Sequence, residues 1–272
     1  METEHNTSVS QSPTDVGESN FEKIVFFGRN LAEYEAMFSF SSADLVGLRV
    51  LDCPGGPACF QALSKEKGIH TVSVDTMYSH SVEQLAAIAQ ADIDETIRKI
   101  QITPEKYQVA NIEEYREKRE SAMRIFLLDF ANGGPLQYVA ASLPILPFAD
   151  DSFDVCLCGF LPFFYSSVES GGCGEGTAAL SLEWHRASLR ELLRVTRSEV
   201  KVYPAINYHT GAVHAYASTL AAEFNDELER GTTENSVDVS GKVFARASFY
   251  TSQYPQKFAE SNFGLLLKKV TP

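Results

Sequence analysis

The sequence has no long apolar run. Hydrophobic residues make up 44% of its 272 positions, but they never approach the roughly 20 consecutive apolar residues that a membrane-spanning helix needs. Residues 1–20 also lack the apolar core of a secretory signal. We therefore expect a soluble cytoplasmic protein that has no membrane partner.

Basic residues are scarce as well. The chain carries 23 Lys and Arg against 36 Asp and Glu, a formal net charge of −13. Binding along a nucleic-acid backbone requires clustered positive charge, and no run of basic residues interleaved with aromatic residues is present. We expect no nucleic-acid partner.

Cysteine is rare and odd in number. Five cysteines in a chain of this length do not resemble the framework of a disulfide-rich secreted protein. Cys156 and Cys158 alternate along an apolar segment, while Cys53 and Cys59 flank a glycine turn. We predict that they are small buried hydrophobic residues and that the protein has no metal site.

Length and composition favour one large domain. A chain of 272 residues with this apolar content can bury a sizeable core. Residues 1–20 are polar and aperiodic, which predicts a disordered tail. We expect a single domain over residues 21–272.

The stretch Arg49–Phe60 carries most information about a ligand. An apolar strand ends at Asp52 and runs through Pro-Gly-Gly-Pro into a helix. Such turns let a nucleotide-like ligand approach the backbone closely. Asp52 would repel a phosphate, but it suits a ligand with a cationic amino acid group and no phosphate. S-adenosylmethionine meets that description.

This stretch resembles the first motif of the class I S-adenosylmethionine-dependent methyltransferases, in particular the type 11-like enzymes that act on small molecules. Their motif is an apolar strand, an acid, and then x-Gly-x-Gly-x-Gly. Here Pro54, Gly56 and Ala58 occupy the three glycine positions, so only the middle glycine is kept. The resemblance implies an α/β fold, a Rossmann-like three-layer sandwich with a mostly parallel seven-stranded sheet. It also implies cofactor contacts at Asp52, Pro54, Gly55 and Gly56.

A second carboxylate follows at the end of the next predicted strand, Ile69–Asp75, after a predicted helix over Phe60–Gly68. Asp75 lies at the distance from Asp52 that suits one βαβ unit. Its carboxylate could accept hydrogen bonds from both ribose hydroxyls of the cofactor. The alternative is that Asp75 simply caps the helix that follows.

The run Leu146–Asp154 is the most family-specific feature. Leu-Pro-Phe-Ala-Asp-Asp-Ser-Phe-Asp resembles the signature that leads into the fourth strand of many small-molecule methyltransferases. Asp150 and Asp151 predict a turn, and Phe153 a core residue. In that family an Asp just before the signature commonly binds adenine. Here Ser142 stands at that position, so Ser142 or the backbone of Leu143 is expected to replace it.

The remaining patterns complete the expected fold. Residues 81–129 carry more helical sequence than one crossover needs and predict an insertion that shapes the substrate pocket. The alternative is a helical pair that thickens the domain or forms the contact of a homodimer. Predicted elsewhere are helices over Leu182–Thr196 and Ala212–Asn225 and strands over Glu199–Tyr203, Ser236–Val243 and Gly264–Val270.

Methyl transfer also needs an aligned acceptor and, for a hydroxyl acceptor, a base. The aromatic residues Phe160, Phe163, Phe164 and Tyr165 predict an apolar or planar acceptor pocket, although strand-end aromatics also close cores. Among the candidates His185, His209, His214, Tyr165 and Tyr208, we predict Tyr165 and His209 to be catalytic, because they follow the fourth and fifth strands. His185 lies on an apolar helix face, which is typical of a core residue.

The sequence thus predicts an S-adenosylmethionine-dependent methyltransferase acting on a small-molecule substrate. A protein of the same fold that binds the cofactor or a partner without catalysis is the alternative, because Pro54, Ala58 and Ser142 replace expected groups. A nicotinamide-dependent oxidoreductase is a third hypothesis, which Asp75 permits but Asp52 disfavours.

Overall fold

The computed structural model describes residues 21–104, 107, 109–134, 136–233, 243–254 and 262–270. The predicted tail over residues 1–20 lies outside this part of the chain. Within the described ranges, no helix combines the length and the hydropathy that crossing a bilayer requires.

Seven strands form a single sheet. They are β1 (Arg49–Asp52), β2 (His70–Val74), β3 (Tyr138–Val139), β4 (Phe153–Gly159), β5 (Thr196–Tyr203), β6 (Phe244–Thr251) and β7 (Phe263–Val270). Their order in the sheet is β3-β2-β1-β4-β5-β7-β6. Neighbours from β3 to β5 are parallel, and β7 is antiparallel to both β5 and β6. The mostly parallel seven-stranded sheet predicted from the sequence is confirmed.

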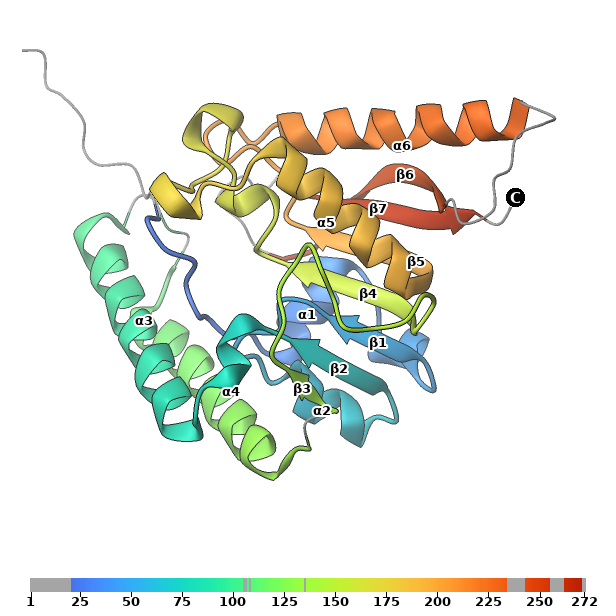
Figure 1. Ribbon diagram of the computed structural model, residues 1–272. Coiled ribbons are helices and arrows are strands. Elements are labelled where there is room, and N and C mark those ends of the chain that lie inside the picture. The colour runs from blue at the N-terminus through green and yellow to red at the C-terminus, as the bar shows by residue number, and fades with distance from the viewer. Residues whose placement is uncertain are drawn as a thin grey trace, which may run out of the picture.

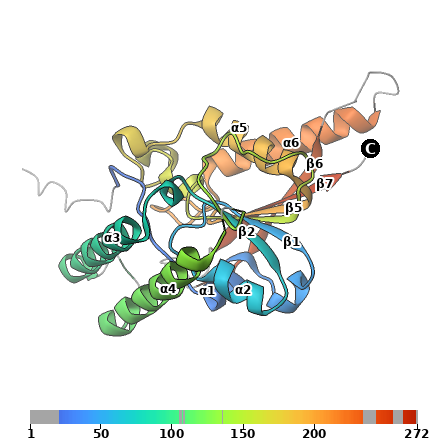
Figure 2. The ribbon, with the colours of Figure 1, turned by 60° about the horizontal axis from the view of Figure 1, so that its bottom comes forward.

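Helices cover both faces of the sheet and make it a three-layer sandwich (Figures 1 and 2). One face packs on α1 (Leu31–Phe38) and α2 (Phe60–Glu66), the other on α5 (Leu182–Val195) and α6 (Ala215–Thr233). Strand β4 shows why the sheet needs both layers. Val155 and Leu157 join the cluster with α1 and α2, whereas Cys156 and Cys158 join the cluster with α5 and α6. Such a central strand is apolar on both sides.

The run before β4 forms the predicted turn. Asp151 adopts φ +55°, and Phe153 is buried at the start of the strand. Arg194 of α5 fixes the turn from the side, because its guanidinium donates to the carbonyl of Phe148 and to the carboxylate of Asp150. The turn thereby aligns β4 against α5.

The predicted helical insertion is also present. It consists of α3 (Val82–Ile102) and α4 (Ile112–Asn132), which pack on each other beyond the carboxyl ends of the strands (Figure 1). Leu85, Ile93 and Ile97 of α3 are buried against Phe126 of α4. The side chain of Asn111 caps α4 by accepting from the backbone N–H groups of residues 113 and 114. The insertion therefore has an apolar core of its own.

Two predicted boundaries at the end of the chain differ from the structure. The edge strand β6 begins at Phe244, whereas the sequence predicted it over Ser236–Val243, most of which lies outside the described residues. Helix α6 runs on to Thr233, beyond its predicted end at Asn225. Asn225 sits inside the helix because its side chain pairs with the backbone of Ala247 in β6. A tertiary contact decides where the polar residue lies.

The turn after β1 is packed too closely for a side chain at Gly55. A Cβ there would lie 2.5 Å from the Tyr78 hydroxyl and 2.8 Å from the Ser73 Cβ. The N–H of Gly55 donates to the carbonyl of Val74. Gly55 therefore brings the turn directly onto the end of β2.

Gly55→Ala should destabilise the protein by about 1–3 kcal/mol, because the added methyl has no room. Gly134→Ala is the matched change, since nothing lies within 4 Å of its Cβ position; its effect should stay within about 0.5 kcal/mol. Urea unfolding of both variants measures the difference. Equal stability of the two would contradict the packing described for Gly55.

Candidate ligand-binding site

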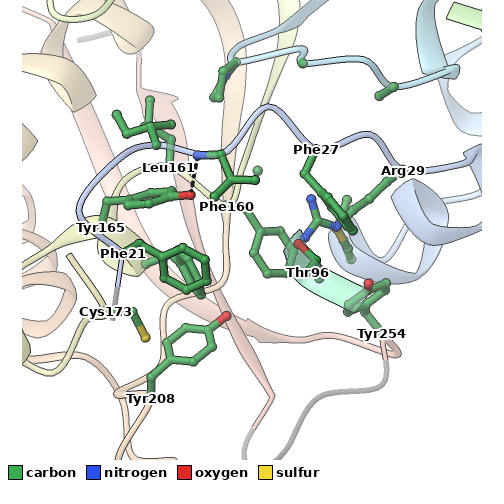
Figure 3. A pocket seen from close by; sticks show the side chains of 18 of the residues that line it. Phe21, Phe27, Arg29, Thr96, Phe160, Leu161, Tyr165, Cys173, Tyr208 and Tyr254 are labelled. Carbon is green, nitrogen blue, oxygen red and sulfur yellow. Dashed lines mark hydrogen bonds between the residues drawn. The ribbon is translucent and has the colours of Figure 1, made fainter. Parts of the chain in front are cut away.

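A cavity of about 570 Å³ opens at the carboxyl ends of the parallel strands. Small-molecule sites commonly measure roughly 300–1,000 Å³, and open α/β sheets bind ligands at this edge. One end of the cavity is lined by Pro54, Gly55, Gly56 and Asp75. The other end is lined by aromatic residues from several segments (Figure 3).

Asp75 lies at the first end and holds the turn in place. Its carboxylate accepts the N–H of Gly56 at 3.0 Å and that of Met77 at 2.9 Å. The second bond is the helix cap that the sequence allowed as an alternative, here on the short 3-10 turn Thr76–Ser79. A carboxylate has about four acceptor positions. The two backbone donors and the side chain of Thr76, which also bonds to Asp75, leave room for a hydroxyl of a ligand. Burial raises the pKa of Asp75.

Asp52 is turned away from the cavity into the core. It is 1% exposed, and it accepts hydrogen bonds from the hydroxyls of Tyr34 and Ser73, both at 3.0 Å. It does not line the cavity, unlike Pro54, Gly55 and Gly56 beside it. Burial raises the pKa of Asp52 to about 7, against the lowering effect of its two hydroxyl partners.

Arg29 places a positive charge inside the cavity. Its guanidinium lies 3.5 Å above the ring of Phe160 at the end of β4. The Nε atom is buried and has no hydrogen-bond partner among the described residues. Buried donors of a guanidinium are normally paired. The part of the Arg29 guanidinium that lines the cavity could pair with an anionic ligand.

Residues 21–29 cross the cavity as an extended segment, which we call the strap. Asp92 of α3 holds it, because this buried carboxylate accepts the N–H of Phe26 at 2.8 Å and the ammonium of Lys23 at 2.5 Å. At its other end Gly28 touches the turn, since a Cβ there would lie 2.0 Å from the carbonyl oxygen of Pro57. The strap thus joins the insertion to the turn after β1.

Both residues predicted to be catalytic line the cavity. The Tyr165 hydroxyl accepts the N–H of Val25 at 2.9 Å, and burial raises its pKa well above the usual value. That environment favours a hydroxyl that donates a hydrogen bond. Nε2 of His209 lies 2.9 Å from the carbonyl oxygen of Gly172. A carbonyl only accepts, so in the neutral ring Nε2 carries the proton and Nδ1 carries the lone pair.

The other candidate histidines lie in the core. His185 and His214 are fully buried, and the ring centroid of each lies 5.3 Å from that of Phe163. His214 bonds to the hydroxyl of Ser166 at 2.7 Å. Burial lowers the pKa of both, for His214 to about 3. The apolar helix face predicted this position for His185.

Ser142 and Leu143 do not line this cavity. Ser142 is exposed in the turn after β3, and Leu143 is buried in the core on the α5 side. All five cysteines have free thiols and are buried. No group of three or more His, Cys, Asp or Glu side chains in the described ranges is arranged to hold a metal ion.

Three parts of the site were not predicted from the sequence. The strap looks like an undistinguished segment, and Asp92 looks like one more acid on an amphipathic helix. Tyr254 follows β6 and reaches the cavity from the far end of the chain. The one available signal in the sequence was the position of Asp92, an acid next to Ile93 on the apolar face of α3.

Asp52→Asn should change how stability depends on pH. The raised pKa means that the folded carboxyl binds its proton more tightly than the unfolded one. Its contribution to stability is therefore complete below pH 4 and is lost as the pH rises through 7. Between pH 5 and pH 8, the free energy of unfolding of the variant should rise by about 2 kcal/mol relative to that of the wild type. His185 and His214 contribute equally to the pH dependence of stability in both proteins.

Urea titrations at several pH values test this, with the exposed Asp226→Asn as the matched variant. A stability difference between Asp52→Asn and the wild type that is constant with pH would contradict the buried protonated state.

Asp92→Asn should loosen the strap, because the amide loses the charge that pairs with Lys23 and one of the two acceptor oxygens. Amide exchange in residues 21–28 should become about tenfold faster, as expected for the loss of one charged hydrogen bond. Asp94→Asn on the same helix changes only surface contacts with Gln90 and Arg116 and should leave the strap unchanged. Hydrogen-exchange mass spectrometry compares the two.

Comparison with known proteins gives matches among solved structures. No family model and no curated protein matches the sequence. Among solved structures, the chain is similar to the Burkholderia thailandensis 1,6-didemethyltoxoflavin-N1-methyltransferase, crystallised with 1,6-didemethyltoxoflavin and S-adenosylhomocysteine. The TM-score is 0.36 and the identity 13%, over 84% of this chain and 75% of that chain. We therefore base the function on the residues of this chain.

Proposed function

We propose that the protein is an S-adenosylmethionine-dependent methyltransferase that acts on a small molecule. The observation that carries this proposal is one cavity that is lined by both a carboxyl group, Asp75, and a guanidinium group, Arg29. A ligand that pairs with both groups needs a hydroxyl at one position and a carboxylate at another. S-adenosylmethionine has a ribose diol and an amino acid carboxylate.

The residues present fit this cofactor. The acceptor capacity left on Asp75 suits a ribose hydroxyl. The guanidinium of Arg29, which lines the cavity, can pair with the carboxylate. Pro54, Gly55 and Gly56 expose backbone to the cavity between these groups. Although two glycines of the motif are missing, Gly55 provides the close approach of this turn to β2.

When bound, S-adenosylmethionine supplies an electrophilic methyl group on a sulfonium, which is transferred by in-line displacement. The protein's own part is to align the acceptor and to exclude water. The strap contributes to both, since Val25 and Phe27 line the cavity while Asp92 holds their segment. His209 provides a nitrogen lone pair for an acceptor proton, and Tyr165 provides a donor hydroxyl.

Binding without catalysis is the alternative from the sequence. Nothing in the cavity favours it over the enzyme, because His209 and Tyr165 line the cavity that also holds Asp75 and Arg29. A cytoplasmic location remains part of the proposal.

Calorimetric titration with S-adenosylhomocysteine and with S-adenosylmethionine tests the proposal directly. We expect micromolar dissociation constants, which correspond to about −8 kcal/mol. Absence of binding to the folded protein would overturn the methyltransferase proposal.

Two variants should separate the two halves of the cofactor. 5′-Methylthioadenosine has the ribose but no amino acid carboxylate. Asp75→Ala should weaken binding of both this nucleoside and S-adenosylhomocysteine by about 2 kcal/mol, as expected for lost charged hydrogen bonds. Arg29→Met should weaken binding of S-adenosylhomocysteine by a similar amount and leave the nucleoside unaffected.

Arg98→Met serves as the reference, because Arg98 is exposed on α3 and pairs with Glu95. Equal losses for both ligands in Arg29→Met would show that Arg29 does not bind the carboxylate.

A further inference from the structure

The far end of the cavity has a continuous aromatic wall. The rings of Phe21, Phe164, Phe160 and Tyr254 follow one another with centroid distances of 5.4, 5.8 and 6.0 Å. All four line the cavity, and they come from the strap, the segment after β4 and the segment after β6. Figure 3 shows three of them, Phe21, Phe160 and Tyr254. The fold therefore gathers aromatic rings from three distant parts of the chain at one place.

The wall residues do more than close the hydrophobic core. Phe163 closes the core at this place, since it is 0% exposed and belongs to the core cluster on the α5 side. The wall residues Phe21, Phe160, Phe164 and Tyr254 are each only half-buried. A ring that merely closes a core would be covered. Here ring surface remains available to a ligand in the cavity.

The strap encloses the space beside the wall. Phe21 pairs with residues 173–175 through two backbone hydrogen bonds, and the N–H of Val25 donates to Tyr165. Thr96 of α3 adds a further lining side chain. A flat ligand held between the strap and the wall would be largely removed from water. Aromatic rings favour stacked or edge-to-face partners in such a space.

Charge favours an acceptor that is not a cation. Arg29 lies over Phe160 in the wall. No described residue that lines the cavity beyond Asp75 is a carboxylate. The sulfonium of the cofactor would add positive charge to the same space. A cationic acceptor would be repelled by these charges and would find no carboxylate other than Asp75 among the described residues that line the cavity.

We propose that the methyl acceptor is an uncharged, planar hydroxyaromatic molecule that stacks on Phe164 in this wall. This inference rests on the proposed methyltransferase function. His209 accepts the hydroxyl proton at Nδ1 while the acceptor oxygen forms a bond to the methyl carbon. The sulfur–methyl bond breaks, its electron pair stays on sulfur, and S-adenosylhomocysteine and the methyl ether are the products.

A matched pair of probes tests the stacking. 2-Naphthol and decahydro-2-naphthol carry the same hydroxyl on the same carbon skeleton, but only the first has aromatic faces. Titration in the presence of saturating S-adenosylhomocysteine should show that 2-naphthol binds at least tenfold more tightly. Equal affinities, tighter binding of the saturated alcohol, or no binding of either would overturn the inference.

Variants show whether the wall is responsible. Phe164→Leu keeps an apolar side chain but removes a ring, and should reduce the preference for 2-naphthol about fivefold or more while S-adenosylhomocysteine binding is retained. Phe249→Leu changes an exposed ring on β6 outside the cavity and should preserve the preference. An unchanged preference in Phe164→Leu would assign the selectivity elsewhere and overturn the inference.

The reaction gives an independent readout. With S-adenosylmethionine, the wild type should convert 2-naphthol into 2-methoxynaphthalene, and His209→Gln should lower kcat at least tenfold with little change in 2-naphthol affinity. S-adenosylhomocysteine binding is titrated separately, and the 2-naphthol titrations are repeated without it. Failure of S-adenosylhomocysteine to bind would overturn the proposed function, whereas loss of the aromatic preference alone would overturn only this inference.

Discussion

One buried carboxyl group connects the parts that the site depends on. Asp52 ends β1, and its two oxygens accept the hydroxyls of Tyr34 in α1 and Ser73 in β2. Because Arg29 lies just before α1 and Asp75 just after β2, both polar ends of the proposed cofactor are positioned by elements bonded to this group. A charge buried this deeply would be costly. Burial therefore favours the neutral form and raises the pKa of Asp52.

Asp52 and Asp75 have divided roles that their sequence positions alone do not reveal. Both end neighbouring parallel strands, yet one faces the core and the other faces the cavity. The difference follows from their neighbours, since Asp52 meets two hydroxyls, whereas Asp75 meets the backbone N–H groups of Gly56 and Met77. Asp52 lies on the core side of the turn, and Asp75 holds the turn from the cavity side.

Much of the fold could be predicted from the sequence, because its signals are local. The strand that ends at Asp52, the turn at Asp151 and the apolar period of α5 each act within a few residues. The strap could not be predicted, because its anchor is a contact between residues 66 positions apart, Phe26 and Asp92. Tyr254 likewise reaches the cavity only through the antiparallel edge of the sheet. Side-chain direction at Asp52 depends on Tyr34, for which no local pattern exists.

The anchoring of the strap has a kinetic consequence. Its backbone is bonded to the insertion at Asp92, to Tyr165 in the 3-10 turn after β4, and to residues 173–175. Release of a ligand past this segment requires these bonds to open, and such segment motions commonly set turnover rates. Release by this route depends on Lys23, Phe26 and Asp92, none of which lines the cavity. Substitutions at these positions would alter how long a product stays bound without altering what is bound.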